Sequence, residues 1–231
     1  MMSKLYKYPH TPYLHFSPTI ESIDEYNRET KLIFNKDNFK NGVFVATIKM
    51  DGENTNFYTD YIHARSLDSR HHESRSYVKQ LHSKIKHLIP SGWRICGENL
   101  YAVHSIKYTD LEDYFLVFSI WDENNNCLTW ENTVMYSKRL GLKTAPVIRP
   151  FLNVEYDENN YFKIDDPDNL IVDKNLLASQ EGFVIRNVES FNYNDFSNNL
   201  AKWVRPNHVQ TDQHWMQKKV EKNLLREKQN D

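Results

Sequence analysis

The order of apolar and polar positions along the chain predicts many short strands and a few helices. Phe115 to Trp121 is apolar throughout except for Ser119, which is typical of a buried central strand. The first strands are expected to be consecutive and joined by tight turns, the first of them at Asp51-Gly52. The predicted strands cover residues 42–49, 54–59, 61–65, 93–99, 115–121, 182–186 and 200–204, and residues 146–154 are expected to be extended.

Helices are expected in four places. The clearest has Tyr77, Leu81, Ile85 and Leu88 at spacings of four, four and three, which predicts a helix over residues 74–88. The other helices are expected over residues 129–139, 168–178 and 213–228, the last capped by Thr211-Asp212. Since strands dominate and helices surround them, the expected class is α+β with mainly antiparallel sheets.

Composition is that of one sizeable domain. A chain of 231 residues is long enough to bury a real core. No run of 18 apolar residues and no signal pattern occurs, so we expect a cytoplasmic protein without a membrane segment. We also expect it to be a monomer. The two cysteines, Cys96 and Cys127, form neither a disulfide framework nor a metal-ligand spacing, and Cys96 is expected to pack. We expect a main domain over 1–210 and a helical extension over 211–231.

Charge is distributed unevenly along the chain. The formal net charge is −2, so contact with a polyanion has to come from local patches. Residues 63–94 hold seven Lys or Arg against two acids, whereas residues 155–173 hold seven acids against one Lys. This asymmetry predicts one basic face and one acidic face.

Four charged residues on predicted strands or turns supply the groups that nucleotidyl transfer requires. Lys49, in Lys-Met-Asp-Gly, is followed by Glu98, Glu181 and Lys202 in that order. An uncharged lysine amine can attack the α-phosphorus of a nucleoside triphosphate and expel pyrophosphate. Burial and a neighbouring cation, here Lys202, are expected to lower the pKa of Lys49. Lys202 is also expected to hold the α-phosphate during attack.

The two carboxylates have two tasks available in such a reaction. One is to hold a divalent metal that bridges the phosphates, and the other is to accept a hydrogen bond from the ribose hydroxyls. Glu98 and Glu181 both stand among apolar residues, where an unpaired carboxylate is costly. A purely structural role would therefore require a cationic partner for each of them.

These motifs resemble the RNA ligases of the covalent nucleotidyltransferase superfamily, which also contains DNA ligases and capping enzymes. Lys49 to Gly52 matches the first motif, Glu98 in Cys-Gly-Glu-Asn-Leu-Tyr the third, Glu181 in Glu-Gly-Phe-Val-Ile-Arg the fourth, and Lys202 the fifth. A single motif of this kind is weak evidence, but four in order are strong evidence. The resemblance covers residues 7 to 215 and implies an ATP-grasp-like adenylation domain.

The resemblance also assigns residues to the nucleotide. Phe118 falls where the family stacks an aromatic ring on the base, and Arg65 where relatives place an arginine near the phosphates. Ile48 stands where many relatives have a glutamate that reads adenine, so base selection is expected to rest on backbone groups and other side chains. Val204 occupies the place of the second lysine of the fifth motif, and Arg205 is the candidate to replace that lysine. The segment from His104 to Tyr108 recurs in small RNA ligases without an assigned role.

Two features separate the RNA ligases from their relatives. Asn54 stands where DNA ligases usually carry an arginine. Only 26 residues follow Arg205, too few for the additional oligonucleotide-binding (OB) barrel of about a hundred residues that DNA ligases and capping enzymes place there. No appended OB barrel is therefore expected, and a capping-type guanylyltransferase or a minimal DNA ligase remains the alternative.

The resemblance implies a three-step reaction with ATP as co-substrate and Mg²⁺ or Mn²⁺ as cofactor. Lys49 takes AMP from ATP, the adenylate moves to a 5′-phosphate end, and a 3′-hydroxyl attacks it and releases AMP, as in RNA repair. Glu181 is the expected metal ligand, and the nucleotide-binding residues are expected to be Ile48, Asn54, Arg65, Glu98, Phe118 and Lys202. The partner would be RNA with 5′-phosphate and 3′-hydroxyl ends. A nucleic-acid-binding protein with a degenerate transferase fold is the non-enzymatic alternative.

Overall fold

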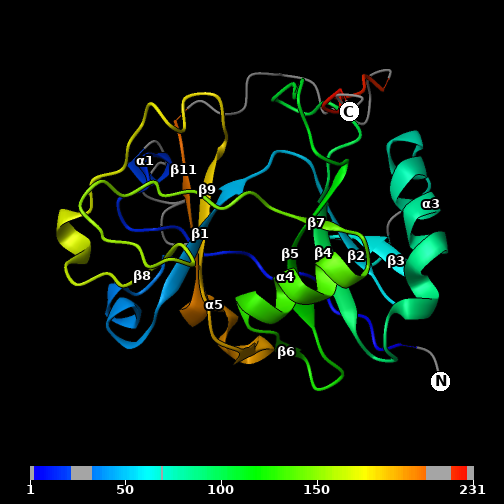
Figure 1. The fold of residues 1–231 in the computed structure, drawn as a ribbon, viewed down its shortest axis with the longest axis horizontal. Coiled ribbons are helices and arrows are strands. Elements are labelled where there is room, and N and C mark those ends of the chain that lie inside the picture. Colours follow the sequence, from blue (N-terminus) through cyan, green and yellow to red (C-terminus); the bar gives the residue numbers. More distant parts are fainter. Residues whose placement is uncertain (1–2, 22–32, 69, 207–219, 228–231) are drawn as a thin grey trace.

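The computed structural model describes residues 3–21, 33–68, 70–206 and 220–227 (Figure 1). Within these ranges the chain forms two sheets with helices packed around them. The strands are β1 (Phe44–Lys49), β2 (Glu53–Phe57), β3 (Ile62–Ala64), β4 (Arg94–Asn99), β5 (Phe115–Trp121), β6 (Asn126–Cys127), β7 (Lys143–Thr144), β8 (Tyr161–Phe162), β9 (Gly182–Asn187), β10 (Phe191–Asn192) and β11 (Leu200–Val204). The α-helices are α1 (Pro18–Glu21), α3 (Ser76–Ile85), α4 (Trp130–Arg139) and α5 (Phe196–Asn199).

The sheets are mainly antiparallel. The four-stranded sheet has the order β11-β9-β1-β8, and the seven-stranded sheet has the order β10-β6-β5-β4-β2-β3, with β7 added in parallel to β5. Short 3₁₀ helices complete the fold: η1 (Lys36–Asn41), η2 (Glu73–Arg75), η3 (Lys86–Leu88), η4 (Pro167–Asn169) and η5 (Tyr193–Asp195). The predicted α+β class is confirmed.

The turn after the first strand differs from the prediction. β1 pairs with β8 and β9, whereas β2 pairs with β3 and β4, so β1 and β2 belong to different sheets. Residues 50–52 therefore carry the chain from one sheet to the other and do not close a hairpin. This crossing places Lys49 at the end of β1, an inner strand, where the chain leaves one sheet for the other.

Two of the predicted helices are wrong in the described residues. In place of a helix over 168–178 the chain has η4 and a run of turns, because Leu152 N–H donates to Ile171 O and Phe151 pairs with Val172, which holds this stretch extended. Of the helix predicted over 213–228, residues 213–219 and 228 lie outside the described residues. Residues 220–227 are extended, with bridges from Lys222 to Ala102 and from Leu225 to Leu111.

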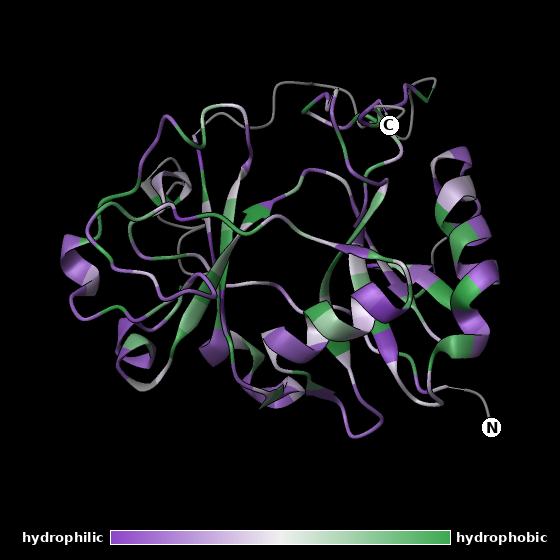
Figure 2. Ribbon diagram, viewed as in Figure 1, coloured by the Kyte–Doolittle hydropathy of each residue, from purple (hydrophilic) through white to green (hydrophobic). Residues whose placement is uncertain are grey.

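Helices cover the outer face of the seven-stranded sheet. The helix predicted over 74–88 is present as η2, α3 and η3, and the helix predicted over 129–139 is present as α4, whose N-cap Thr129 accepts from Asn132 N–H. The buried stripe of α3 is Val78, His82 and Ile85, so it is rotated from the predicted one. Figure 2 shows α3 with both hydrophobic and hydrophilic patches, as expected for a helix that packs on one side. No helix of the described part of the chain has the length and apolar character needed to span a bilayer.

A β-bulge in β5 separates its two faces. Cys96 pairs with Ser119 and Gly97 pairs with Val117, which leaves Phe118 as the extra residue. Phe115 and Val117 pack in the cluster beneath α3 and α4, while Phe118 packs with the cluster around Trp121 on the opposite side. The bulge thus turns Phe118 toward the space between the sheets.

Candidate functional site

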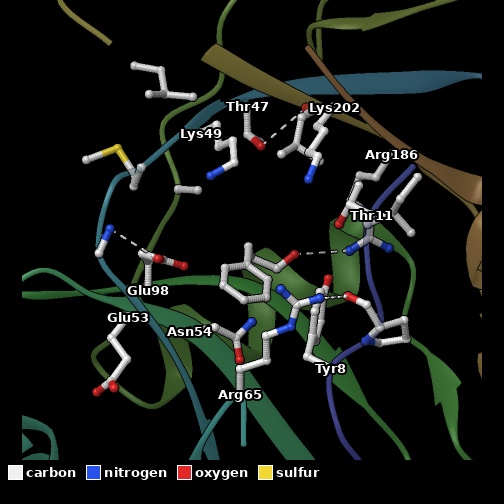
Figure 3. A pocket seen from close by; sticks show the side chains of 18 of the residues that line it. Tyr8, Thr11, Thr47, Lys49, Glu53, Asn54, Arg65, Glu98, Arg186 and Lys202 are labelled. Atoms are coloured by element: carbon white, nitrogen blue, oxygen red, sulfur yellow. Dashed lines mark hydrogen bonds between the residues drawn. The ribbon is translucent and has the colours of Figure 1, made fainter. Parts of the chain in front are cut away.

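A pocket of about 610 Å³ lies between the two sheets (Figure 3). The four-stranded sheet contributes one wall through β1, β9 and β11, and the seven-stranded sheet contributes the other through β2, β4 and β5. All seven residues predicted to be catalytic or nucleotide-binding line it: Ile48, Lys49, Asn54, Arg65, Glu98, Phe118 and Lys202. Residues separated by as much as 154 positions in the sequence are therefore brought to one cavity.

Lys49 ends β1 with its side chain one quarter exposed, at 26 %. Its Nζ donates to Glu181 Oε2 at 2.5 Å, and Glu181 is buried. Burial lowers the pKa of Lys49, but the carboxylates of Glu181, Glu98 and Asp51 together outweigh it and leave the pKa raised. The prediction that its environment lowers the pKa of Lys49 is therefore wrong for this state, in which three neighbouring carboxylates favour the ammonium.

Glu98 is partly buried on β4, directly opposite Asn54 on β2. Burial raises the pKa of Glu98 to about 8, an effect that the nearby Lys49 counteracts and that Glu181 and Asp51 reinforce. Its Oε1 accepts from Gly52 N–H at 3.2 Å, so it is also tied to the chain crossing between the sheets. The raised pKa makes Glu98 a weaker acid than an exposed glutamate, while Glu181 forms an ion pair with Lys49.

Two glycines permit the close packing around Lys49. A Cβ on Gly52 would lie 2.5 Å from the backbone oxygen of Asn99, and a Cβ on Gly182 would lie 2.0 Å from that of Trp203. Neither backbone oxygen has room to retreat, because each belongs to a strand of its sheet. The glycines after Asp51 and Glu181 are therefore required by the approach of neighbouring strands.

An aromatic and aliphatic zone lies farther along the pocket. Phe118 packs edge-to-face on Tyr8, with ring centroids 5.1 Å apart, and Tyr8 is buried. Val184 enters from β9, opposite both Thr47 on β1 and Lys202 on β11. This zone offers apolar surface from both sheets, as a flat heterocyclic ring requires.

Two of the remaining predicted cations, Lys202 and Arg65, line the pocket, and a third, Arg205, does not (Figure 3). Lys202 on β11 has its Nζ 4.1 Å from the ring centroid of Tyr13. Arg65 donates to Pro9 O at 3.2 Å, and burial lowers its pKa. Arg205 follows β11, where its N–H donates to Glu181 O, and it is not among the residues that line the pocket.

Several lining residues were not predicted. Thr47 and Val184 follow from strand alternation once Lys49 and Lys202 are placed, so the sequence contained a signal for them. Arg186, two positions after Val184 on β9, follows by the same alternation, whereas Tyr8 and Thr11 had no such signal because the amino-terminal segment reaches the pocket only through tertiary packing. Arg186 is buried and donates to Leu128 O at 2.7 Å and to Phe118 O at 3.4 Å, which ties the bulge to β9.

The carboxylates near Lys49 suit a metal ion that is held jointly by the protein and by substrate phosphates better than one held by the protein alone. Among the described residues, no group of three or more His, Cys, Asp or Glu side chains is arranged to hold a metal ion. Mg²⁺ commonly binds through one or two carboxylates together with substrate phosphates. Glu181 and Glu98 both act on the charge of Lys49, so they lie at the place where such phosphates would have to reach the amine.

Comparisons with known proteins give one family and one group of structures. The model of the family described as RNA ligase matches residues 42–204, which is more than half of the chain. Among curated proteins nothing matches. Residues 42–204 include all four motif residues, from Lys49 to Lys202.

The solved structures with similarity to this chain include several of the RNA ligase of Naegleria gruberi. A mutant of it with ATP and Mn is 15 % identical with a TM-score of 0.49, covering 87 % of this chain and 56 % of that one. The same ligase with PPi is 17 % identical with a TM-score of 0.48, covering 85 % and 55 %. The chain thus spans about half the length of the structures that it matches.

Proposed function

Because this chain belongs to the RNA ligase family, we propose that it is an ATP-dependent RNA ligase that carries AMP on Lys49. One observation carries the proposal: Lys49, Glu98 and Lys202 converge on one pocket, with Glu181 2.5 Å from the Lys49 amine. This arrangement supplies a nucleophile, a cation for the α-phosphate and carboxylates within a partly enclosed cavity.

In the first step, Nζ of Lys49 forms a bond to the α-phosphorus of ATP while the bond to the β-phosphate oxygen breaks and pyrophosphate leaves. An ammonium has no lone pair, so its proton must leave to solvent before attack. Glu181 makes the largest contribution to the raised pKa of Lys49. Once Glu181 is engaged elsewhere, the pKa of Lys49 falls and the free amine becomes available.

A divalent metal fits this role for Glu181. Glu181 would hold it together with the phosphates of ATP, and the metal would neutralise negative charge on the transferring phosphoryl group. Lys202, on the same wall as Lys49, would hold the α-phosphate in line for attack. Phe118 and Val184 would enclose the base, and Asn54 and Arg65 would complete the walls.

The adenylate would then be transferred to an RNA end. The 5′-phosphate oxygen displaces Lys49 from the α-phosphorus, and a 3′-hydroxyl then attacks the activated 5′-phosphate and displaces AMP. Each step is an in-line displacement at phosphorus, so the same cationic surroundings serve all three.

The test is to incubate the protein with Mg²⁺ and α-³²P-labelled ATP or GTP in parallel, and to look for label that survives denaturation. We expect label from ATP on the wild type and none on Lys49→Ala or Lys49→Arg, since arginine supplies no neutral amine. Lys84→Ala, which alters an exposed lysine on α3, is the matched control and should keep its label. Label on Lys49→Ala would contradict the proposal, and label from GTP alone would favour a guanylyltransferase.

A further inference from the structure

Asp51 is held away from the pocket by a loop that the proposed chemistry does not use. Its Oδ2 accepts from the N–H groups of Ser105 and Ile106 at 2.7 and 2.8 Å. Its own N–H donates to the Tyr108 hydroxyl at 2.9 Å. The loop from 104 to 108 therefore fixes both the side chain and the backbone of the residue two positions after Lys49.

The same loop is held from behind by the carboxyl-terminal segment, residues 220–227. Asn223 is fully buried there, and its Oδ1 accepts from Tyr108 N–H at 2.7 Å. Its Nδ2 donates to Leu100 O at 2.8 Å and to Ala102 O at 3.2 Å. Asn223 thus joins residues 100 and 102, just after β4, to Tyr108, whose hydroxyl accepts from Asp51 N–H.

Backbone bonds run along both sides of Asn223. Val103 N–H donates to Glu221 O at 2.8 Å, Leu224 N–H to Tyr108 O at 2.9 Å, and Leu111 N–H to Leu224 O at 3.0 Å. These bonds hold the segment in place, and the Asn223 side chain adds bonds to Tyr108 and to the residues just after β4. This segment lies outside residues 42–204, the region shared with the family.

An amide is the side chain that this position requires. It must accept from one N–H and donate to two carbonyl groups at once, which neither a carboxylate nor an aliphatic side chain can do. A carboxylate would face the oxygens of Leu100 and Ala102 without a proton to share. Buried donors and acceptors are costly to leave unpaired, so the loop would shift to find partners.

We propose that Asn223 is a positioning residue for the nucleophile: through the 104–108 loop and Asp51 it fixes the place of Lys49 in the pocket. The inference rests on the proposed function, because it concerns the lysine that carries AMP. Misplacing a reacting group by about 1 Å can reduce a rate by about a hundredfold. The effect should fall on attack by Lys49 and spare the later step in which Lys49 takes no part.

The test compares two reactions in Asn223→Asp. Self-adenylation at saturating ATP needs the amine of Lys49, whereas joining of an RNA strand that is already adenylated at its 5′ end does not. We expect self-adenylation to slow by about a hundredfold, with joining of the pre-adenylated strand and affinity for ATP unchanged. Glu227→Gln, an exposed position in the same segment, should leave both reactions unchanged.

Tyr108→Phe provides a milder second variant. It removes only the hydroxyl that accepts from Asp51 N–H, and it should slow self-adenylation less than Asn223→Asp while sparing the joining reaction. Unchanged self-adenylation in both variants would overturn the proposal. An equal loss of both reactions, accompanied by a lower melting temperature, would also overturn it, because Asn223 would then serve stability alone.

Hydrogen exchange separates this inference from the ligase proposal. Absence of label on the wild type would count against the ligase, not against the contact between Asn223 and the loop. In Asn223→Asp, faster exchange of the Ser105 and Ile106 amides would support that contact, since these amides are held by Asp51. Unchanged exchange would overturn it.

Discussion

The two walls of the pocket differ in their electrostatic character. On the four-stranded sheet, Lys49, Glu181 and Lys202 are close together, and Glu181 is paired with the Lys49 ammonium. On the seven-stranded sheet, Glu98 has a pKa of about 8, next to Asn54 and the ring of Phe118. The first wall therefore holds an ion pair and Lys202, whereas the second combines a carboxyl of raised pKa with an amide and an aromatic ring, and its pocket cation is Arg65 after β3.

This difference suggests a division of labour between the walls. In this proposal, chemistry at phosphorus falls to Lys49, Glu181 and Lys202 of the first wall, whereas the second wall supplies most of the surface for the base and its sugar, with Val184 added from β9. Changes to the first wall should alter the rate of chemistry, and changes to the second should alter affinity or stability. Substitutions on each wall test that assignment.

The largest effect is expected for Glu181→Gln. Loss of the carboxylate removes the expected metal ligand, and metal charge stabilisation is worth several kcal/mol, so self-adenylation should slow by about a hundredfold or more. The requirement for Mg²⁺ or Mn²⁺ should shift to higher concentration, and the pH profile should move to lower pH because Glu181 no longer raises the pKa of Lys49. An unchanged response to metal concentration would place the metal elsewhere.

A smaller effect is expected for Phe118→Leu. Stacking of one base on an aromatic ring is worth about 1–3 kcal/mol, so affinity for ATP should weaken by about 5- to 150-fold. The rate at saturating ATP should stay close to that of the wild type, since Phe118 is on the recognition wall. Phe118→Tyr keeps an aromatic ring and serves as the control. A loss of rate with unchanged affinity would break the division between the walls.

The smallest effect is expected for Glu98→Gln on stability. The folded pKa of about 8 lies above the ordinary value of 4.5, so the folded state binds a proton more tightly than the unfolded state. The resulting stabilisation is complete below pH 4.5 and is lost as pH rises through 8. Glutamine does not titrate, so the melting temperature of the mutant, measured relative to that of the wild type, should rise as the pH is raised from 5 to 9. A constant difference across that range would mean that Glu98 has an ordinary pKa.

Much of the pocket could be predicted because many of its residues lie within short sequence motifs. Lys49 with its Asp-Gly turn, Glu98 and Lys202 stand on strands that alternation identifies, and strand pairing then brings them to one cavity. The bulge at Phe118 was not visible in the sequence, since an extra residue in an apolar run leaves the run intact. The charge state of Lys49 also depends on distances to carboxylates that only the folded chain sets.

The remaining errors come from segments whose shape is decided by distant partners. Residues 168–178 have helix-compatible composition, but pairing with residues 151–152 holds part of them extended. The segment 220–227 is held by the loop after β4, a contact across more than a hundred positions. Periodicity reports only which side of a segment is apolar, and these segments are shaped by hydrogen bonds of the backbone and of Asn223.

The most direct test of the account is to digest the protein after reaction with ATP and to locate the adenylate by peptide mass spectrometry. The account predicts that the modified peptide contains Lys49 and that Lys202, on the same wall, is unmodified. An adenylate on Lys202, or on another lysine with Lys49 unmodified, would contradict it, because the residue paired with Glu181 would then not be the nucleophile.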